Sequence, residues 1–334
     1  SEMCIRDSTF DGQLGKIYNN AQLMGKIDLP THISTSFRFI ASISTFDYYK
    51  KDKLFSRNDK PSFNSKDERF VKLMVALPFL ANKRAEFSLG YGQLEDNYFQ
   101  SSVIDFDKDR SDRSTYKLLG GSIGFYGSTL NTRQYATKGY LEKLIAQVFT
   151  GRERFEPGNP QEGYSPSPQE RQSWLQISYM KEAYHTMGPK FTLGWMAEAL
   201  YSSKNFSENY TATMMQAGEF APTPHSKLMY NEAFRANQYV AAGIKPIYVL
   251  NDMFQFRTEF YGFTPIFPIK KNALNKAYYG KAFSRFEYMG EVSVICHLPF
   301  GAISAYVNHY SSPRREWNVG MTIGWQLFNY RFVE

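Results

Sequence analysis

Apolar and polar side chains alternate, residue by residue, along most of this chain of 334 residues. In residues 317–327 the apolar members are Trp317, Val319, Met321, Ile323, Trp325 and Leu327, and the residues between them are polar or small. Similar runs occur in residues 37–43, 71–77, 175–179, 191–201 and 288–298. A period of two is the pattern of a β-strand with one apolar face, whereas an amphipathic helix repeats about every 3.6 residues. The sequence therefore predicts an all-β fold.

The length of these runs and the character of their polar faces indicate an antiparallel transmembrane β-barrel. Runs of about 10 to 15 residues exceed the usual globular strand and are long enough to cross a bilayer when tilted. Large aromatic residues near the strand ends are typical of an aromatic girdle, and Arg, Lys and Glu on the other face fit a wet lumen. The mean hydropathy of −0.46 is compatible with this, since every second residue faces the lumen. A soluble β-sandwich or lipocalin-like barrel is the alternative.

The alternation also predicts which side chains face lipid. Those expected to face lipid are Trp325, Ile323, Trp195 and Leu193, and those expected to face the lumen are Gln326, Thr322, Gly194 and Glu198. The connections alternate between short and long, as periplasmic turns and extracellular loops do. The long connections are residues 50–68, 96–114, 152–172, 202–236 and 265–281.

Residues 1–8 (SEMCIRDS) stand apart from this pattern. They contain no apolar run of the kind that signal peptides carry, and they fit no strand pattern. We interpret them as a non-native remnant and expect the barrel domain to cover residues 9–334.

Three segments, in their order along the chain, resemble a known family. They are the turn Ala136-Thr137-Lys138-Gly139, the segment from Asn231 to Tyr239 (NEAFRANQY), and the end of the chain from Gly290 to Phe328. The chain resembles the C-terminal barrel of the bacterial surface-antigen superfamily, which includes the barrel-assembly insertase and the two-partner secretion transporters. The closest resemblance is to the barrel half of outer-membrane patatin-like phospholipases. Two positions depart from the family: Ala136 replaces a Pro of the turn, and only Arg235 remains of a Val-Arg-Gly-aromatic loop motif.

The resemblance implies that the loop around Arg235 folds back into the lumen, where the Arg meets polar groups on barrel strands. Glu259 is the candidate partner, because the alternation places it on the polar face of its strand together with Arg257. A bidentate pair in a partly desolvated lumen would fix the loop. The alternative is that Arg235 is a solvated loop charge.

The final strand carries a second resemblance, to the signal that the barrel-assembly machinery reads. The matching residues are Asn318, Gly320, Ile323 and Trp325, with Phe332 as a further aromatic residue near the end. The physical basis of such a signal is strand addition, in which an exposed edge pairs with a partner strand. The alternative is an ordinary amphipathic last strand.

Residues 120–124 (GGSIG) match the Gly-x-Ser-x-Gly pattern of serine hydrolases. A nucleophile elbow needs a strand, a sharp turn and then a helix that supports the exposed Ser. Here the pattern lies inside an alternating strand, residues 116–127, and no helical pattern follows. We therefore predict that Ser122 faces the lumen and that this chain has no catalytic residues. A soluble serine hydrolase using Ser122 is the weakest of the alternatives.

Composition adds little other chemistry. The five His and two Cys show no metal-ligand spacing, so the sequence predicts no metal site and no cofactor. The net charge of +7 arises from basic residues scattered through strands and loops. That scatter does not favour nucleic-acid binding, and basic loops beside anionic lipid explain it more simply.

The strand count predicts a truncated chain. We count about thirteen strands, whereas single-chain bacterial barrels have an even number. The first of them, residues 16–29, would begin on the extracellular side, and the resemblance implies about sixteen strands. About three strands are therefore expected to be missing at the front, unless one short strand has been overlooked.

These patterns predict an outer-membrane barrel that anchors or translocates an upstream patatin-like domain, with the catalytic domain absent from this chain. Its expected partners are outer-membrane lipid, the barrel-assembly machinery and the upstream domain of the same parent chain. The alternative is a stand-alone pore or transporter. A structured loop inside the lumen favours the first function, and an open wet bore favours the second.

Overall fold

The computed structural model describes residues 5–14, 18–29, 35–48, 64–100, 110–159, 171–299, 301–311, 317–324 and 330–333. These residues form an antiparallel sheet of 14 strands in which each strand pairs with the next one along the chain. This all-β architecture confirms the predicted fold class. Among the described residues, no helix has both the length and the apolar character needed to cross a membrane.

The strands of the sheet are long. In chain order they are β1 (Ile5–Gln13), β2 (Tyr18–Leu29), β3 (Thr35–Tyr48), β4 (Asn64–Leu80), β5 (Lys83–Tyr98), β6 (Asp112–Ser128), β7 (Gly139–Glu156), β8 (Arg171–Thr186), β9 (Phe191–Ser202), β12 (Gln238–Val249), β13 (Phe254–Pro265), β16 (Glu287–Leu298), β17 (Gly301–Tyr310) and β18 (Trp317–Ile323). The remaining elements lie in connections: α1 (Tyr210–Gln216), the 3-10 turns η1 (Ser226–Leu228) and η2 (Glu232–Phe234), and the two-stranded pairs β10 (Gly218–Glu219) with β11 (Arg235–Ala236) and β14 (Ile269–Lys271) with β15 (Ala277–Tyr279).

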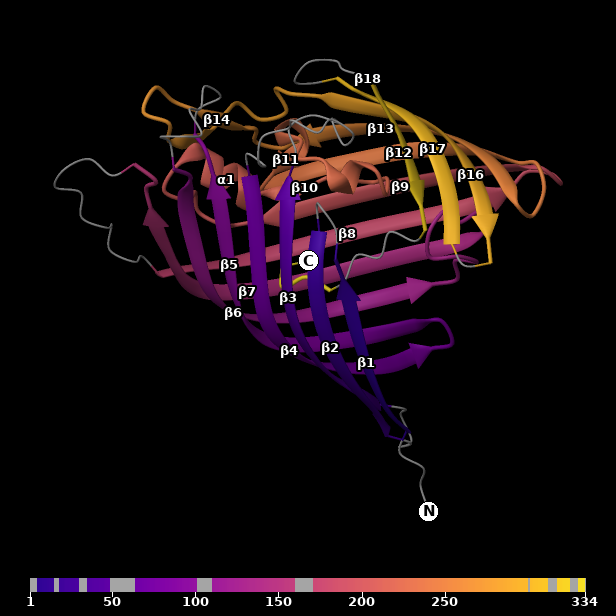
Figure 1. Cartoon of the computed structure of the whole chain (residues 1–334), viewed down its shortest axis with the longest axis horizontal. Helices are drawn as coiled ribbons and strands as arrows, with labels where there is room; N and C mark the ends of the chain where they lie inside the picture. Colours follow the sequence, from indigo (N-terminus) through magenta and orange to yellow (C-terminus); the bar gives the residue numbers. More distant parts are fainter. Residues whose placement is uncertain are drawn as a thin grey trace.

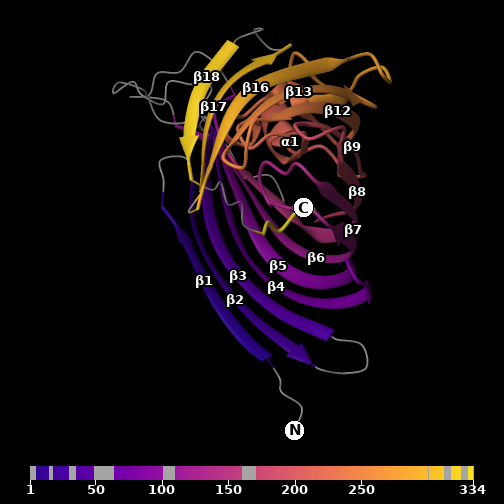
Figure 2. The same cartoon turned by 90° about the vertical axis from the view of Figure 1, so that its right-hand side faces the viewer.

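The sheet curls around an interior that holds α1, β10 and β11 (Figures 1 and 2). In the sheet order β1 and β18 are the two ends. Short connections, such as the two residues between β4 and β5, lie at one rim because successive strands are antiparallel. The long connection between β9 and β12 starts from the other rim and enters the interior.

The outward face of the sheet is apolar and exposed, as the alternation predicts. Ile323 is 68% exposed, whereas the hydroxyl of Thr322 contacts Ser304 on the inner face. In β9, Leu193 and Trp195 point outward and alternate with the buried Gly194. The carboxylate of Glu198 accepts a hydrogen bond from an inward-facing Tyr. Trp325 and Gln326 lie outside the described residues.

Two expectations about the start of the chain are wrong. Residues 5–8, expected to fit no strand, belong to β1, which pairs with β2 from Ile5 opposite Asp28 to Gln13 opposite Asn20. The described residues form a sheet of 14 strands, one more than the predicted count of about thirteen, so the odd count is not observed among them. β1 was missed because its sequence, IRDSTFDGQ, has too few apolar residues to show alternation. Truncation itself, and the foreign origin of residues 1–8, stay predictions.

Candidate functional site in the lumen

The connection between β9 and β12, residues 203–237, lies inside the curled sheet, next to β9, β12 and β13 (Figure 2). We call it the lumenal loop. Its polar side chains bond to opposite parts of the wall: Asn209 donates to the hydroxyl of Tyr98 on β5 at 2.7 Å, and Thr223 donates to Glu291 on β16 at 3.0 Å. The loop therefore spans the lumen and contacts both sides of the curled sheet.

The start of the lumenal loop is ordered by a capped helix. The side chain of Asn209 accepts a hydrogen bond from the backbone N–H of Ala212 at 2.8 Å, which satisfies one of the free amides at the beginning of α1. Met214 and Met215 of this helix are buried. Because α1 has only seven residues, burial and the cap, rather than helix propensity, hold it in place.

Arg235 lies at the end of the lumenal loop and is only 5% exposed. Its guanidinium is 2.7 Å from the carboxylate of Glu219 and donates to the carbonyl oxygen of Met215 at 3.3 Å. The rings of Tyr230 and Tyr48 lie 4.7 and 5.7 Å from it, and Tyr48 belongs to β3. Burial disfavours the charged form, but the Glu219 carboxylate, together with Tyr48 and Tyr230, holds the pKa of Arg235 above its ordinary value. Arg235 is therefore a buried, charged contact between the loop and the barrel wall.

The predicted pairing of Arg235 with Glu259 is wrong. Glu259 is held instead by Arg257, two residues away on the same face of β13, at 2.8 Å, and it also accepts from the hydroxyl of Tyr261 at 2.7 Å. Glu219 meets Arg235 because the two residues are directly opposite each other in the β10–β11 pair. The alternative of a solvated Arg235 is also excluded, since the side chain is buried.

Arg257 secures a second insertion into the lumen. The connection between β6 and β7 turns at Gly139, whose φ of +90° and proximity to Thr129 leave no room for a side chain. In this connection the buried Ala136 accepts a hydrogen bond from Arg257 at 3.0 Å, and the carbonyl of Tyr135 accepts one from Gln255 at 3.2 Å. The turn singled out by the family resemblance is therefore bound to β13.

A His fixes the middle of the lumenal loop. The Nδ1 atom of His225 lies 2.8 Å from a carboxylate oxygen of Glu291, and its Nε2 atom lies 3.1 Å from the hydroxyl of Ser304. These distances are those of a Ser-His-Glu catalytic triad. However, Ser304 is 1% exposed, and the hydroxyls of Tyr135 and Thr322 also contact its oxygen. A substrate carbonyl therefore cannot reach the Ser304 oxygen, and the cluster instead binds the lumenal loop to β16 and β17.

Lys204 is a buried cation at the base of the loop. Its ammonium lies 4.7 Å from the ring of Tyr116 and 4.8 Å from that of Trp174, and it donates to Gln216 at 3.1 Å. Burial lowers the pKa of Lys204 from 10.5 to about 8, although Glu153 counteracts part of that effect. Contacts with aromatic faces offset some of the cost of burying the charge.

Aromatic rings of the lumenal loop pack against β12, β13 and β17. Phe220 of the lumenal loop stacks on Phe263 of β13 with ring centroids 5.9 Å apart, and Phe234 packs edge-on against Tyr310 of β17 at 5.8 Å. These rings are buried in one cluster with Tyr239 and Tyr261. The interior next to β12–β17 is therefore filled by side chains.

The residues of the predicted assembly signal lie at the end of the sheet. In β18, Asn318 donates to Asn308 of β17 at 3.0 Å, and Ile323 faces outward. A side chain at Gly320 would meet the end of the Tyr306 ring, which would have to move. Trp325 lies outside the described residues. Phe332 is buried on the inner wall against Phe70, Phe149 and other rings, so it is not a strand-end side chain facing lipid.

Ser122 is not at an elbow. It lies within β6, which continues to Ser128, and its hydroxyl is 2.6 Å from that of Ser88 on β5. The inward position of Ser122 was predicted. Glu219, His225 and Lys204 were missed, because no short motif marks them and their partners depend on how the loop folds.

Comparison with known proteins identifies the fold. No protein-family model and no curated protein matches the sequence. BamA from Haemophilus ducreyi lacking POTRA domains 1–3 is similar in structure, with a TM-score of 0.61 and 10% identity over 96% of this chain. CdiB from Acinetobacter baumannii covers 96% of this chain at 9% identity, but its TM-score of 0.48 is too low to carry an argument. The chain spans 64% of the length of the BamA chain. The described part of the chain therefore has the fold of this BamA barrel.

Proposed function

We propose that this chain is an outer-membrane β-barrel domain that anchors or translocates a polypeptide and whose lumen is closed by its own loop. Three observations support this: the exposed apolar outer face, the likeness to BamA, and the packing of the lumenal loop inside the sheet against β9, β12, β13, β16 and β17. The last observation carries the proposal, because a diffusion pore needs a continuous water-filled bore.

The lumenal loop favours this function over a stand-alone pore. It crosses the interior and is fixed at three separated points by Arg235, His225 and Lys204. Each of these side chains is at least nine-tenths buried. Withdrawing Arg235 and His225 would leave the carboxylates of Glu219 and Glu291 without these partners, and an unpaired buried charge is costly. A loop held in this way would keep the lumen closed at all times, without a ligand or partner.

The finer parts of the proposal come from the sequence. We propose that the upstream partner in the parent chain is a patatin-like domain, and that Asn318, Gly320, Ile323 and Trp325 form the signal for the barrel-assembly machinery. The position of Asn318, Gly320 and Ile323 on β18, at one end of the sheet order, supports a role in strand addition.

The proposal is tested by conductance in planar bilayers. We expect the protein to conduct little, and a variant in which residues 205–234 are replaced by a short Gly-Ser linker to form stable open channels. The control replaces Ala81 and Asn82, in the turn between β4 and β5, by Gly and should leave conductance unchanged. Large, steady channels from the unmodified protein would instead support the diffusion pore.

A further inference from the structure

Residues 330–333 lie inside the curled sheet, on the inner wall of β4 to β7 (Figure 2). We call them the inner segment. The ring of Phe332 is buried there against Phe70 of β4 and Phe149 of β7, with ring centroids 5.9 and 5.7 Å away. The inner segment follows β18 in the sequence, yet these contacts are with strands in the other half of the sheet order.

Three inward-facing glycines make the space for this ring: Gly90 and Gly92 of β5 and Gly120 of β6. A Cβ atom at Gly92 would lie 2.9 Å from the Phe332 ring. Cβ atoms at Gly90 and Gly120 would lie 3.1 and 3.4 Å from the same ring. Glycine within a strand weakens the strand and often marks a place where a ligand approaches closely. The ring therefore occupies a recess that ordinary side chains would fill.

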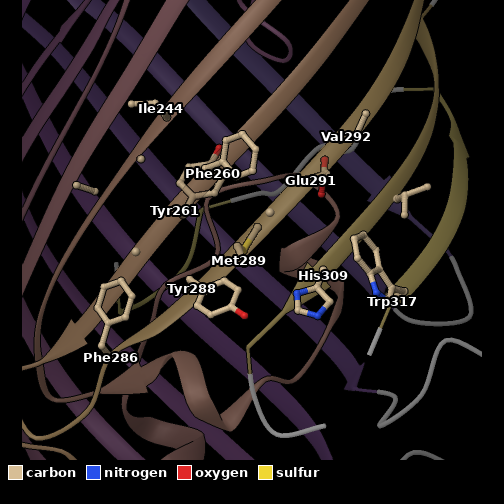
Figure 3. A pocket seen from close by; sticks show the side chains of 15 residues that line it. Ile244, Phe260, Tyr261, Phe286, Tyr288, Met289, Glu291, Val292, His309 and Trp317 are labelled. Atoms are coloured by element: carbon tan, nitrogen blue, oxygen red, sulfur yellow. The ribbon is translucent and has the colours of Figure 1, made fainter. Parts of the chain in front are cut away.

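Glycines on the outer face of the sheet have different surroundings. Gly262 and Gly290 lie on the floor of an apolar hollow of about 510 Å³ that opens outward (Figure 3). A Cβ atom at Gly290 would approach the Phe260 ring only to an ordinary contact distance of 3.5 Å, so the hollow has room for a side chain. The inner recess differs because a segment of the chain already fills it.

Two side chains of β4, each 5% exposed, bind the backbone of the inner segment. The Nζ atom of Lys72 donates to the carbonyl oxygen of Arg331 at 2.9 Å. A carboxylate oxygen of Glu68 accepts from the backbone N–H of Phe332 at 2.9 Å, and its other oxygen lies 3.9 Å from the Arg331 guanidinium. Every residue of a peptide except Pro carries both backbone groups, so an extended peptide of another sequence could make the same two hydrogen bonds.

We propose that this part of the inner wall is a peptide-binding site and that the inner segment is its resident, displaceable ligand. Its ligand class is an extended peptide in which a basic residue precedes an aromatic one, as in residues 330–333 (YRFV). Backbone hydrogen bonds supply affinity and the recess selects the ring, as in other peptide sites. Within the inner segment only Phe332 is buried, so few contacts oppose its exchange. The inference goes beyond the proposed function and does not depend on it, because these contacts lie within the sheet.

The experiment measures binding of a fluorescein-labelled Tyr-Arg-Phe-Val peptide by fluorescence anisotropy, with the protein in detergent micelles. Phe332→Ala removes the resident ring. We expect the peptide to bind this variant at least about tenfold more tightly than the unmodified protein, because the tethered inner segment competes at an effective concentration in the millimolar range. The matched peptide Tyr-Arg-Ala-Val should bind the variant at least about tenfold more weakly, since it lacks the ring.

Variants of the wall test the recess, each combined with Phe332→Ala. Gly92→Val should fill the recess and abolish peptide binding. Gly124→Ala adds a side chain to the same inner face further along β6, where its nearest neighbour is the Tyr126 ring, and should leave binding unchanged. Lys72→Met removes the donor to the peptide carbonyl and should weaken binding about tenfold, which keeps the test available if Gly92→Val does not fold. Heat-modifiable gel mobility shows whether each variant is folded.

Each contrary outcome has a definite meaning. No binding to folded Phe332→Ala would identify the inner segment as a fixed part of the core and overturn the peptide site. Equal binding to Phe332→Ala and to the unmodified protein, or equal binding of the two peptides, would show that the peptide binds elsewhere. Equal binding by the Gly92→Val and Gly124→Ala variants would likewise overturn the recess as the site.

Discussion

Single buried charges in the lumen decide how firmly the loop is held. Arg235 has a carboxylate, backbone carbonyls and two rings around it, and no apolar residue could satisfy those oxygens. Because guanidinium groups have a fixed planar set of donors, Lys would not reproduce these contacts. The geometry of the site depends on Arg at this position.

We expect Arg235→Ala to lower the free energy of unfolding by about 3–5 kcal/mol, because it leaves Glu219 without its cation in a largely buried place. Lys276→Ala breaks an ion pair whose side chains are 51% and 39% exposed, so it should cost at most about 1 kcal/mol. Urea unfolding in lipid bilayers measures both. Similar losses in the two variants would contradict the role assigned to Arg235.

Lys204 should make stability depend on pH in the alkaline range. Its pKa falls from 10.5 to about 8 on folding, so between these values the unfolded chain binds more protons and stability rises with pH. We expect Lys204→Met to remove this gain, and the unfolding free energy of the unmodified protein should approach that of the variant by roughly 1 kcal/mol from pH 7 to 9. A constant difference between the two proteins over this range would show that Lys204 is already neutral or is not buried.

At the scale of single strands, alternation predicts depth-dependent tolerance on the outer face. Leu73 and Leu80 of β4 are 59% and 58% exposed, but Leu73 lies within the strand and Leu80 ends it beside the turn. We expect Leu73→Arg to cost about 2–4 kcal/mol, as at the bilayer midplane, and Leu80→Arg about 0–1 kcal/mol. Unfolding titrations of both variants measure this. Equal costs would argue that the strand does not cross a bilayer.

The strands could be predicted from the sequence because each carries its own signal of alternating faces. β1 could not, since a polar edge strand such as IRDSTFDGQ is defined by its pairing with β2. The same limit applies to the site. Arg235 was identified from a resemblance, but its partner depends on the register of β10 and β11, two strands of two residues each with no pattern to read. Lumenal partners follow from tertiary packing, which local periodicity does not encode.

For the molecule as a whole, the inner and outer faces of the sheet differ in character. Buried polar networks that are fully satisfied rigidify a structure, and the lumenal loop places such networks on several strands of the wall. The outer face has the opposite character, with apolar side chains exposed along most strands. The polar contacts fix the lumenal loop to the wall, and the apolar outer face is suited to lipid. Together they support the proposed anchoring function over a soluble enzyme.

We therefore expect no ester hydrolysis by this chain, and the two serines that invite the idea allow a decisive test. Ser122 lies within a continuous strand beside Ser88, without the exposed turn that a nucleophile needs. Ser304 has a His and a Glu at triad distances, but it is buried and surrounded by hydroxyls. Assays with short-chain and long-chain p-nitrophenyl esters should give background rates for the unmodified protein, Ser122→Ala and Ser304→Ala alike. Turnover that is lost in only one of these variants would identify its serine as a nucleophile and would overturn the anchoring function as a complete account of the chain.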